Sequence, residues 1–397
     1  MPDPVSNPQS RVALVRCEDY EPGRVLDAVR RALDLLGGVE ALVQPGQRVL
    51  LKPNMLSAKP PEKAVTTHPA VVRAMATIVR EAGAQAWVGD SPGGLSWNVM
   101  QKTMEATGIG QAALDAGAEI KDFDAGEAEF ADLPDGVILK RFAIARAVRE
   151  ADAVVSLAKL KTHGQALYTG AVKNMLGCVP GGGKIRMHQL APIGRQLAAA
   201  LLDIYAAIRP RFALIDAIVA MEGNGPAHGD PRPLGLLIAS TDAVAADAVA
   251  CHIVGYPARS IHLLRQAEER GLGIGSLDRI EVVGEPLDEC VVPDFVRASN
   301  LFYELIPAWL ARWIGGAVRV DPEIVQQECR RCGLCQRSCP ADAIEGKGEL
   351  TINHAACIRC FCCHELCPHG AIVLRRSWLV RLYEWMHRKK RNVKRDA

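Results

Sequence analysis

Up to about residue 320, short apolar runs alternate with longer stretches in which apolar residues recur every three or four positions. Short runs bounded by Gly, Pro or polar residues predict strands, and the three-to-four-residue period predicts helices. The predicted strands are 11–16, 48–51, 86–89, 137–142, 153–157, 212–220, 234–239 and 280–283. The predicted helices are 24–36, 69–82, 98–106, 195–208, 243–254 and 261–270. This alternation predicts an α/β domain with a mostly parallel sheet and flanking helices on both faces.

A cysteine-rich segment comes after this region in the chain. Of the 13 cysteines, nine lie between Cys329 and Cys367, and eight of these form two runs with the spacing Cys-x2-Cys-x2-Cys-x3-Cys-Pro. The second run repeats the first after 28 residues. The cysteines of the first run are Cys329, Cys332, Cys335 and Cys339, and those of the second run are Cys357, Cys360, Cys363 and Cys367.

This spacing has a chemical reason. A 4Fe–4S cluster needs four converging thiolates, and two-residue gaps let one tight loop present three of them. The fourth thiolate must come from elsewhere, and in two-cluster proteins the last cysteine of each run serves the other cluster. We therefore predict two 4Fe–4S clusters, one on Cys329, Cys332, Cys335 and Cys367 and one on Cys357, Cys360, Cys363 and Cys339.

Zinc is the alternative, because zinc sites with four cysteine ligands also use two-residue gaps. Zinc would explain pairs of cysteines, but neither the third cysteine of each run nor the Cys-Pro that ends it. Residues 320–376 resemble the two-cluster bacterial ferredoxin domain, a small α+β unit. Cys362 fits neither run, and we interpret it as a spare thiol.

Polar or Gly- and Pro-rich sequence follows five of the predicted strands. In open α/β sheets, ligands bind beyond the carboxyl ends of the strands. The richest segment runs from Lys159 to His188 and contains a loop of three glycines, whose N–H groups could bind an anion. We expect a phosphate- or carboxylate-bearing molecule at this edge, although a solvated lysine-rich loop gives the same pattern. The predicted substrate-binding residues are Lys52, Asn54, Lys161, Lys173, Asn174, Lys184 and Glu222.

Three residues near this edge are candidates for acid–base chemistry. They are His163, His188 and Asp90. Histidine changes its charge near neutral pH, and a carboxylate at a strand end can accept a proton. Each also has an ordinary alternative role: a histidine that is only hydrogen-bonded, or an aspartate that forms a turn or caps a helix.

Several of these blocks carry a family resemblance. The blocks are Lys52-Pro53-Asn54 and the segments 89–93, 159–163, 172–177 and 221–226. They resemble the blocks of the domain-of-unknown-function family 362 over roughly residues 11–285. Members of that family often carry an appended ferredoxin module. The resemblance implies a single α/β domain and iron–sulfur binding, and it supplies no reaction.

Composition and charge narrow the function class. Apolar residues make up 49% of the chain and charged residues 23%, as in globular proteins. The formal net charge is +2 and aromatic residues are only 5%, which disfavours nucleic acid as a partner. No apolar run has the length of a membrane span, and the first residues lack the apolar core of a signal peptide, so we expect a cytoplasmic protein.

The remaining segments suggest contacts outside the two domains. The predicted organisation is an α/β domain over 1–298, an apolar helical connector over 299–321, two 4Fe–4S repeats over 322–376 and a basic amphipathic tail over 377–397. The tail contains two tryptophans and five consecutive basic residues, His387-Arg388-Lys389-Lys390-Arg391. Such a tail suits peripheral contact with the anionic inner face of a membrane or with an acidic partner. The alternative, which we favour on the sequence alone, is that connector and tail pack the ferredoxin unit against the α/β domain and leave a solvated basic end.

Two functional hypotheses remain open. In the first, the protein is an iron–sulfur oxidoreductase whose two 4Fe–4S clusters relay electrons to or from an anionic small molecule at the strand ends. In the second, it is a non-catalytic electron-transfer or docking subunit of a larger redox assembly. Both hypotheses require a redox partner protein as electron donor or acceptor, and neither requires nucleic acid.

Overall fold

The computed structural model describes residues 10–93, 98–124, 128–191, 194–257, 260–298 and 320–376. The chain divides into two compact units, Met1–Ala298 and Ser299–Ala397. Almost all of the predicted connector, and the whole tail from residue 377, lie outside the described residues. Both therefore stay predictions.

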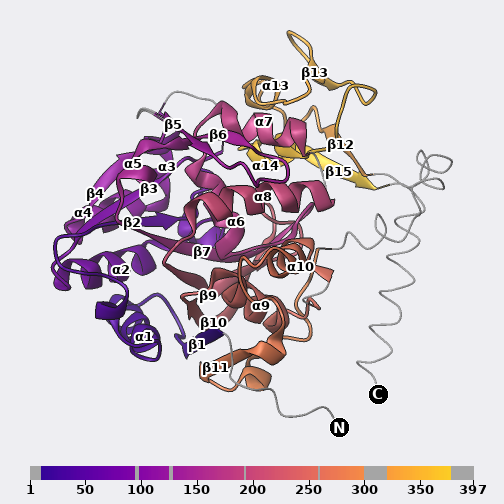
Figure 1. Cartoon of the computed structure of the whole chain (residues 1–397). Helices are drawn as coiled ribbons and strands as arrows, with labels where there is room; N and C mark the ends of the chain where they lie inside the picture. Colours follow the sequence, from indigo (N-terminus) through magenta and orange to yellow (C-terminus); the bar gives the residue numbers. More distant parts are fainter. Residues whose placement is uncertain are drawn as a thin grey trace, which may run out of the picture. The chain divides into compact units, whose positions relative to one another are not determined.

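A nine-stranded sheet forms the centre of the first unit (Figure 1). Its strands are β1 Ser10–Arg16, β2 Arg48–Pro53, β3 Gln85–Asp90, β4 Glu119–Asp122, β7 Ala153–His163, β8 Leu167–Thr169, β9 Phe212–Glu222, β10 Asp230–Ser240 and β11 Ile280–Gly284. The order is β11-β1-β10-β9-β7-β2-β3-β4, with β8 paired to β7. Five neighbouring pairs are parallel, and β10 runs antiparallel to both of its neighbours. The predicted mostly parallel α/β fold is confirmed.

Helices cover both faces of this sheet. Alternate residues of β1 point to opposite faces, with Val12 and Leu14 in one hydrophobic cluster and Ala13 and Val15 in another. The cluster of Val12 includes residues of the helices 194–208 and 243–253, and the cluster of Ala13 includes residues of the helices 22–34 and 69–81. The helices are α1 Pro22–Asp34, α2 Pro69–Glu81, α3 Val99–Thr107, α4 Ile109–Asp115, α5 Arg146–Glu150, α6 Ala171–Asn174, α7 Gly182–Leu190, α8 Gly194–Ile208, α9 Ala243–Ile253 and α10 His262–Glu269. Short 3₁₀ helices lie at Val39–Ala41, Pro61–Lys63, Met175–Cys178, Leu277–Arg279 and Leu287–Cys290.

The second unit is small and built from two similar halves. Strand β12 (Val320–Ile324) pairs antiparallel with β15 (Ile372–Arg376), and β13 (Ile344–Glu345) pairs with β14 (Thr351–Ile352). Helix α13 (Leu334–Arg337) and helix α14 (Cys362–Leu366) begin 28 residues apart. The sequence repeat is therefore also a repeat of secondary structure.

The predicted strand 137–142 is wrong in its first half. A strand pair does form here, between β5 (Ala128–Asp132) and β6 (Arg141–Ala145), but it starts only at Arg141. The backbone N–H groups of 137, 138 and 139 instead donate to the carboxylate of Asp203 on α8, at 2.9, 2.7 and 2.8 Å. Asp203 is 0% exposed and also binds Arg270 at 2.7 Å. A side chain thus satisfies the donors that a neighbouring strand would otherwise take.

Two other elements differ from the prediction. Strand β7 runs to His163 and does not end at residue 157, so Lys159 and Lys161 lie within the strand and not in a loop beyond it. Gly182 and Gly183 open helix α7, and only Gly181, with a φ of 43°, precedes it in the left-handed region. The expected glycine loop is therefore a helix start.

We predict that Asp203→Asn lowers the free energy of unfolding by about 3 kcal/mol. The change removes a buried charge that neutralises Arg270 and leaves at least one buried amide without its acceptor. Denaturant unfolding followed by circular dichroism measures it. The matched control is Glu150→Gln, which breaks an exposed pair with Arg146 and should cost no more than about 0.5 kcal/mol. An Asp203→Asn protein as stable as the control would contradict the assignment.

Candidate functional site

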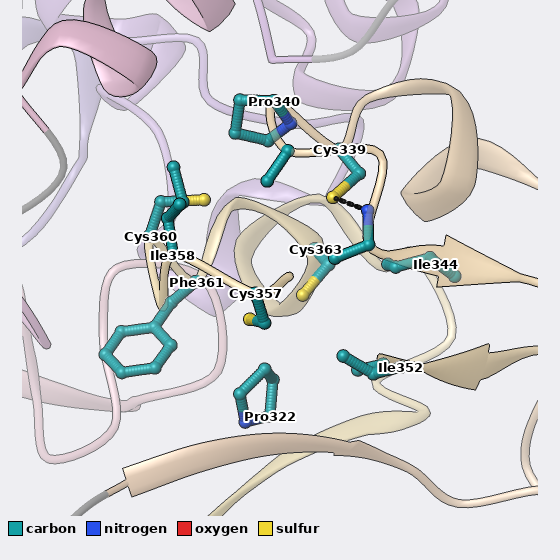
Figure 2. Close-up of a pocket in the computed structure, with 12 residues that line it drawn as sticks. Pro322, Cys339, Pro340, Ile344, Ile352, Cys357, Ile358, Cys360, Phe361 and Cys363 are labelled. Atoms are coloured by element: carbon teal, nitrogen blue, oxygen red, sulfur yellow. Dashed lines mark hydrogen bonds between the residues drawn. The ribbon is translucent and has the colours of Figure 1, made fainter. Parts of the chain in front are cut away.

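Four cysteines line one cavity in the second unit (Figure 2). They are Cys357, Cys360 and Cys363 from the second run and Cys339 from the first. The rest of the wall is largely apolar, and Figure 2 shows the four sulfur atoms directed toward a common hollow. Cys362 is not among the lining residues. The last cysteine of the first run therefore crosses to the group formed by the second run.

The complementary group forms around Cys335. Burial is the largest cause that raises the pKa of the Cys335 thiol to about 11, and the neighbouring Cys367, Cys332 and Cys329 raise it further. Cys367 belongs to the second run, so this group also draws one cysteine from the opposite half. Cys332 is exposed, whereas Cys360 at the equivalent position of the second run is buried.

Each group supplies the four sulfur donors that a 4Fe–4S cluster requires. Backbone amides already point at two of the sulfurs, with Ala343 N donating to Cys339 Sγ at 3.2 Å and Arg359 N donating to Cys357 Sγ at 3.4 Å. Such bonds favour the thiolate form and tune a bound cluster. Within the described ranges, no three His, Cys, Asp or Glu side chains are arranged to hold a single metal ion.

In the first unit, the carboxyl edge of the sheet carries a buried ion pair. Lys52 Nζ on β2 lies 2.7 Å from Asp90 Oδ1 on the neighbouring strand β3. The same amine donates to Asn174 Oδ1 and to the Pro53 carbonyl, both at 2.8 Å. A Cβ at position 177 would collide with both charged groups, so Gly177 is required for this close approach. The structure thus joins three of the predicted site residues, Lys52, Asp90 and Asn174.

Two more predicted lysines have protein partners. Lys161 Nζ donates to Asn54 Oδ1 at 2.6 Å and to the Val65 carbonyl at 2.7 Å. Lys184 Nζ donates to the Ser91 carbonyl, to Ser91 Oγ at 2.6 Å and to the Pro92 carbonyl at 3.2 Å. Burial lowers the pKa of Lys184 to about 8.

The two candidate histidines lie close to Lys173. Burial, and then the charge of Lys173, lower the pKa of His163 well below its usual value and that of His188 to about 4. His163 Nδ1 accepts the amides of Gln165 and Ala166 at 3.1 and 3.2 Å. His188 Nδ1 is buried with no hydrogen-bond partner among the described residues. Both rings are thus held neutral in a positively charged environment.

The side chain of Glu222, the remaining predicted residue, binds the backbone of a neighbouring segment. Its carboxylate accepts the amide of Val296 at 2.8 Å, and it ends β9 opposite Asp230.

Sequence reasoning missed a second buried ion pair at the same edge. Lys159 Nζ on β7 lies 2.9 Å from Asp216 Oδ2 on β9 and 2.8 Å from the Tyr20 hydroxyl. That hydroxyl donates to Asp216 Oδ1 at 2.8 Å, and the Tyr20 ring stacks on His68 with centroids 3.5 Å apart. Burial lowers the pKa of His68 to about 4. A lone aspartate within the apolar run of β9 was the available signal, whereas nothing in the sequence marks Tyr20.

No helix of the described residues is long and apolar enough to cross a bilayer.

Both units are similar to known proteins. Residues 322–345 match the model of a 4Fe-4S binding domain, which covers the first cysteine run. Over 262 residues the chain is 37% identical to a thylakoid-associated protein of Synechocystis sp., an alignment that spans 66% of this chain and 79% of that protein. The lactate racemase apoprotein of Thermoanaerobacterium thermosaccharolyticum aligns with a TM-score of 0.40 at 14% identity, over 64% of this chain and 58% of that one. Residues 49–252 match the model of the domain of unknown function DUF362, and the chain belongs to that family.

Proposed function

We propose that this protein is an iron–sulfur oxidoreductase that holds two 4Fe–4S clusters and passes electrons between a redox partner protein and an anionic small molecule at the sheet edge. The observation that carries the proposal is the cavity lined by Cys339 together with three cysteines of the second run (Figure 2). The family match to a 4Fe-4S binding domain covers the first run only. The equal spacing of the second run and its own sulfur-lined cavity support a second cluster.

The crossed ligand sets predict an unusual result for double variants. Cys335→Ala and Cys339→Ala should each leave one intact cluster, or about four iron atoms per chain, because each change affects a different cluster. Together they should abolish both clusters, although the two residues lie in the same run. Cys339→Ala with Cys363→Ala should still leave about four iron atoms, because both serve one cluster. Iron and sulfide analysis with Mössbauer spectra on anaerobically purified protein measures this.

Cys362→Ala is the matched control and should keep about eight iron atoms per chain. Without crossing, the two double variants would exchange their results. Stoichiometric zinc in the wild-type protein would overturn the cluster assignment altogether.

The surroundings of Lys173 support an anionic ligand in the first unit. Burial, and then the charge of Lys173, lower the pKa of both His163 and His188. An anion at this point would offset that charge and would let either histidine carry a proton. The substrate class that fits is a small molecule bearing a phosphate or a carboxylate.

Inorganic phosphate should therefore raise the thermal midpoint of the wild-type protein but not that of Lys173→Met. A ligand that binds only the folded state stabilises it by about 1.4 kcal/mol at a concentration tenfold above Kd. Lys63→Met, at an exposed position, is the control and should respond like the wild type. An equal response in Lys173→Met would mean that phosphate binds elsewhere.

The pH dependence gives an independent readout of the same variant. The pKa of His188 is lower in the folded state, about 4, than its ordinary value of 6.5. Its contribution to stability is therefore present above pH 6.5 and is lost as the pH falls toward 4. Lys173→Met should raise this pKa, which narrows the pH window of the loss and makes the total loss smaller.

We also propose peripheral membrane contact through the tail, which would suit the alternative role as a subunit of a larger redox assembly. A thylakoid-associated relative supports it, as do the tryptophans and basic cluster of residues 378–391. Deleting residues 378–397 should abolish flotation with anionic lipid vesicles, and flotation of the full chain should weaken at high salt. A length-matched variant in which Gln replaces Arg388, Lys389, Lys390 and Arg391 should also float less, because it removes the basic cluster and keeps the tryptophans. Unchanged flotation after the deletion would rule out the tail as the contact.

A further inference from the structure

The two cysteine loops of the second unit have similar backbone conformations. Arg331 and Arg359, which are 28 residues apart, both have left-handed φ values, 54° and 56°. Gly333 and Phe361 repeat this agreement with φ values of 71° and 57°, and a helix follows each of them. Any functional difference between the loops must therefore come from their side chains.

The first loop is exposed and positively charged. We name residues 328–337 the basic loop. Its Cys332 is exposed, and so are three arginines, Arg330, Arg331 and Arg337. Neither Arg330 nor Arg331 has an ion-pair partner among the described residues, and Arg337 donates to the carbonyl of Cys332 at 3.2 Å. Glu328 supplies the one acidic side chain of the basic loop, so its side chains other than the ligand cysteines carry a net positive charge.

The second loop is enclosed and its charge is compensated. Cys360 is 7% exposed. The cysteine cavity is also lined by Ile358 and Phe361 from the same loop. Arg359, the counterpart of Arg331, binds Asp321 on β12 at 2.9 Å. A negatively charged protein surface would therefore be attracted to the first loop more than to the second.

We propose that the basic loop is the docking surface for an acidic one-electron carrier protein, which exchanges electrons with the cluster held by Cys329, Cys332, Cys335 and Cys367. This inference rests on the proposed function. In the reducing direction the carrier loses one electron and the cluster gains it, with no bond made or broken. Exposure of a ligand cysteine brings the carrier close to the cluster, and the arginines attract a negative surface at long range.

Stopped-flow reduction by an acidic flavodoxin in its fully reduced state provides the test. The observed rate with the wild-type protein should fall as NaCl is added, because salt screens the attraction. The variant Arg330→Glu, Arg331→Glu, Arg337→Glu should react at least about tenfold more slowly at low salt, with a salt dependence that is flat or reversed. Calorimetric titration with oxidised flavodoxin should show the same loss of binding without electron transfer.

Arg375→Glu is the single-charge control, to be compared with Arg331→Glu. Arg375 is exposed, is ion-paired with Glu323 at 2.8 Å and lies opposite Asp321, the partner of Arg359, in the β12–β15 register. It should leave both the rate and the binding within about twofold of wild type, because a distant exposed charge is screened. An equal effect of Arg375→Glu would show a bulk charge effect and overturn the docking surface.

Photoreduced 5-deazariboflavin, an uncharged reductant, separates this inference from the proposed function. If it reduces no iron–sulfur signal in the wild type, the proposed function fails. The other outcome is that it reduces the wild type and all variants equally while the rate with flavodoxin is unchanged by salt and by the three substitutions. In that case only the basic loop fails as a docking surface.

Discussion

The cost of burying an ammonium group governs how the carboxyl edge of the sheet is built. A charged amine withdrawn from water is stable only where protein acceptors replace its hydration. Lys52 and Lys159 are each 1% exposed, and each faces a buried carboxylate on the adjacent strand. The first pair ties β2 to β3 and the second ties β7 to β9, so four neighbouring strand ends are held in register by two ion pairs. Asn174 and Gly177 then have fixed roles, one as an acceptor and one as the residue that leaves room.

The same constraint separates structural lysines from those suited to a ligand. An anion that approached Lys52 would have to compete with Asp90, whose carboxylate already accepts two backbone amides. Near Lys173, burial and the charge of that lysine lower the pKa of both His163 and His188, so both imidazoles are uncharged at neutral pH. The residue type alone could not show that Lys52 is committed to Asp90, because that carboxylate lies on another strand.

The sequence predicted a structural feature when residues close together in the chain determine it, and failed when a distant residue does. The cysteine runs predicted their crossed grouping, because cluster geometry restricts the spacing of ligands within a loop. The strands with continuous apolar runs were found, since burial on both faces leaves little choice of residue. The error at 137–139 arose from Asp203, a partner more than sixty residues away in the chain. The role of Tyr20 likewise depends on a distant carboxylate, that of Asp216. The extension of β7 depends on its pairing with β8 and β9.

The exchange of one cysteine between the two halves also sets an order of events during synthesis. Neither sulfur group is complete within its own half, since the group around Cys335 needs Cys367 from the second half and the group around Cys363 needs Cys339 from the first half. A nascent chain that has exposed only residues up to the middle of this unit therefore presents three thiols per group at most. On the proposed ligand sets, neither cluster can find its four cysteines until nearly the whole unit has been synthesised, so both halves are needed for either cluster to form.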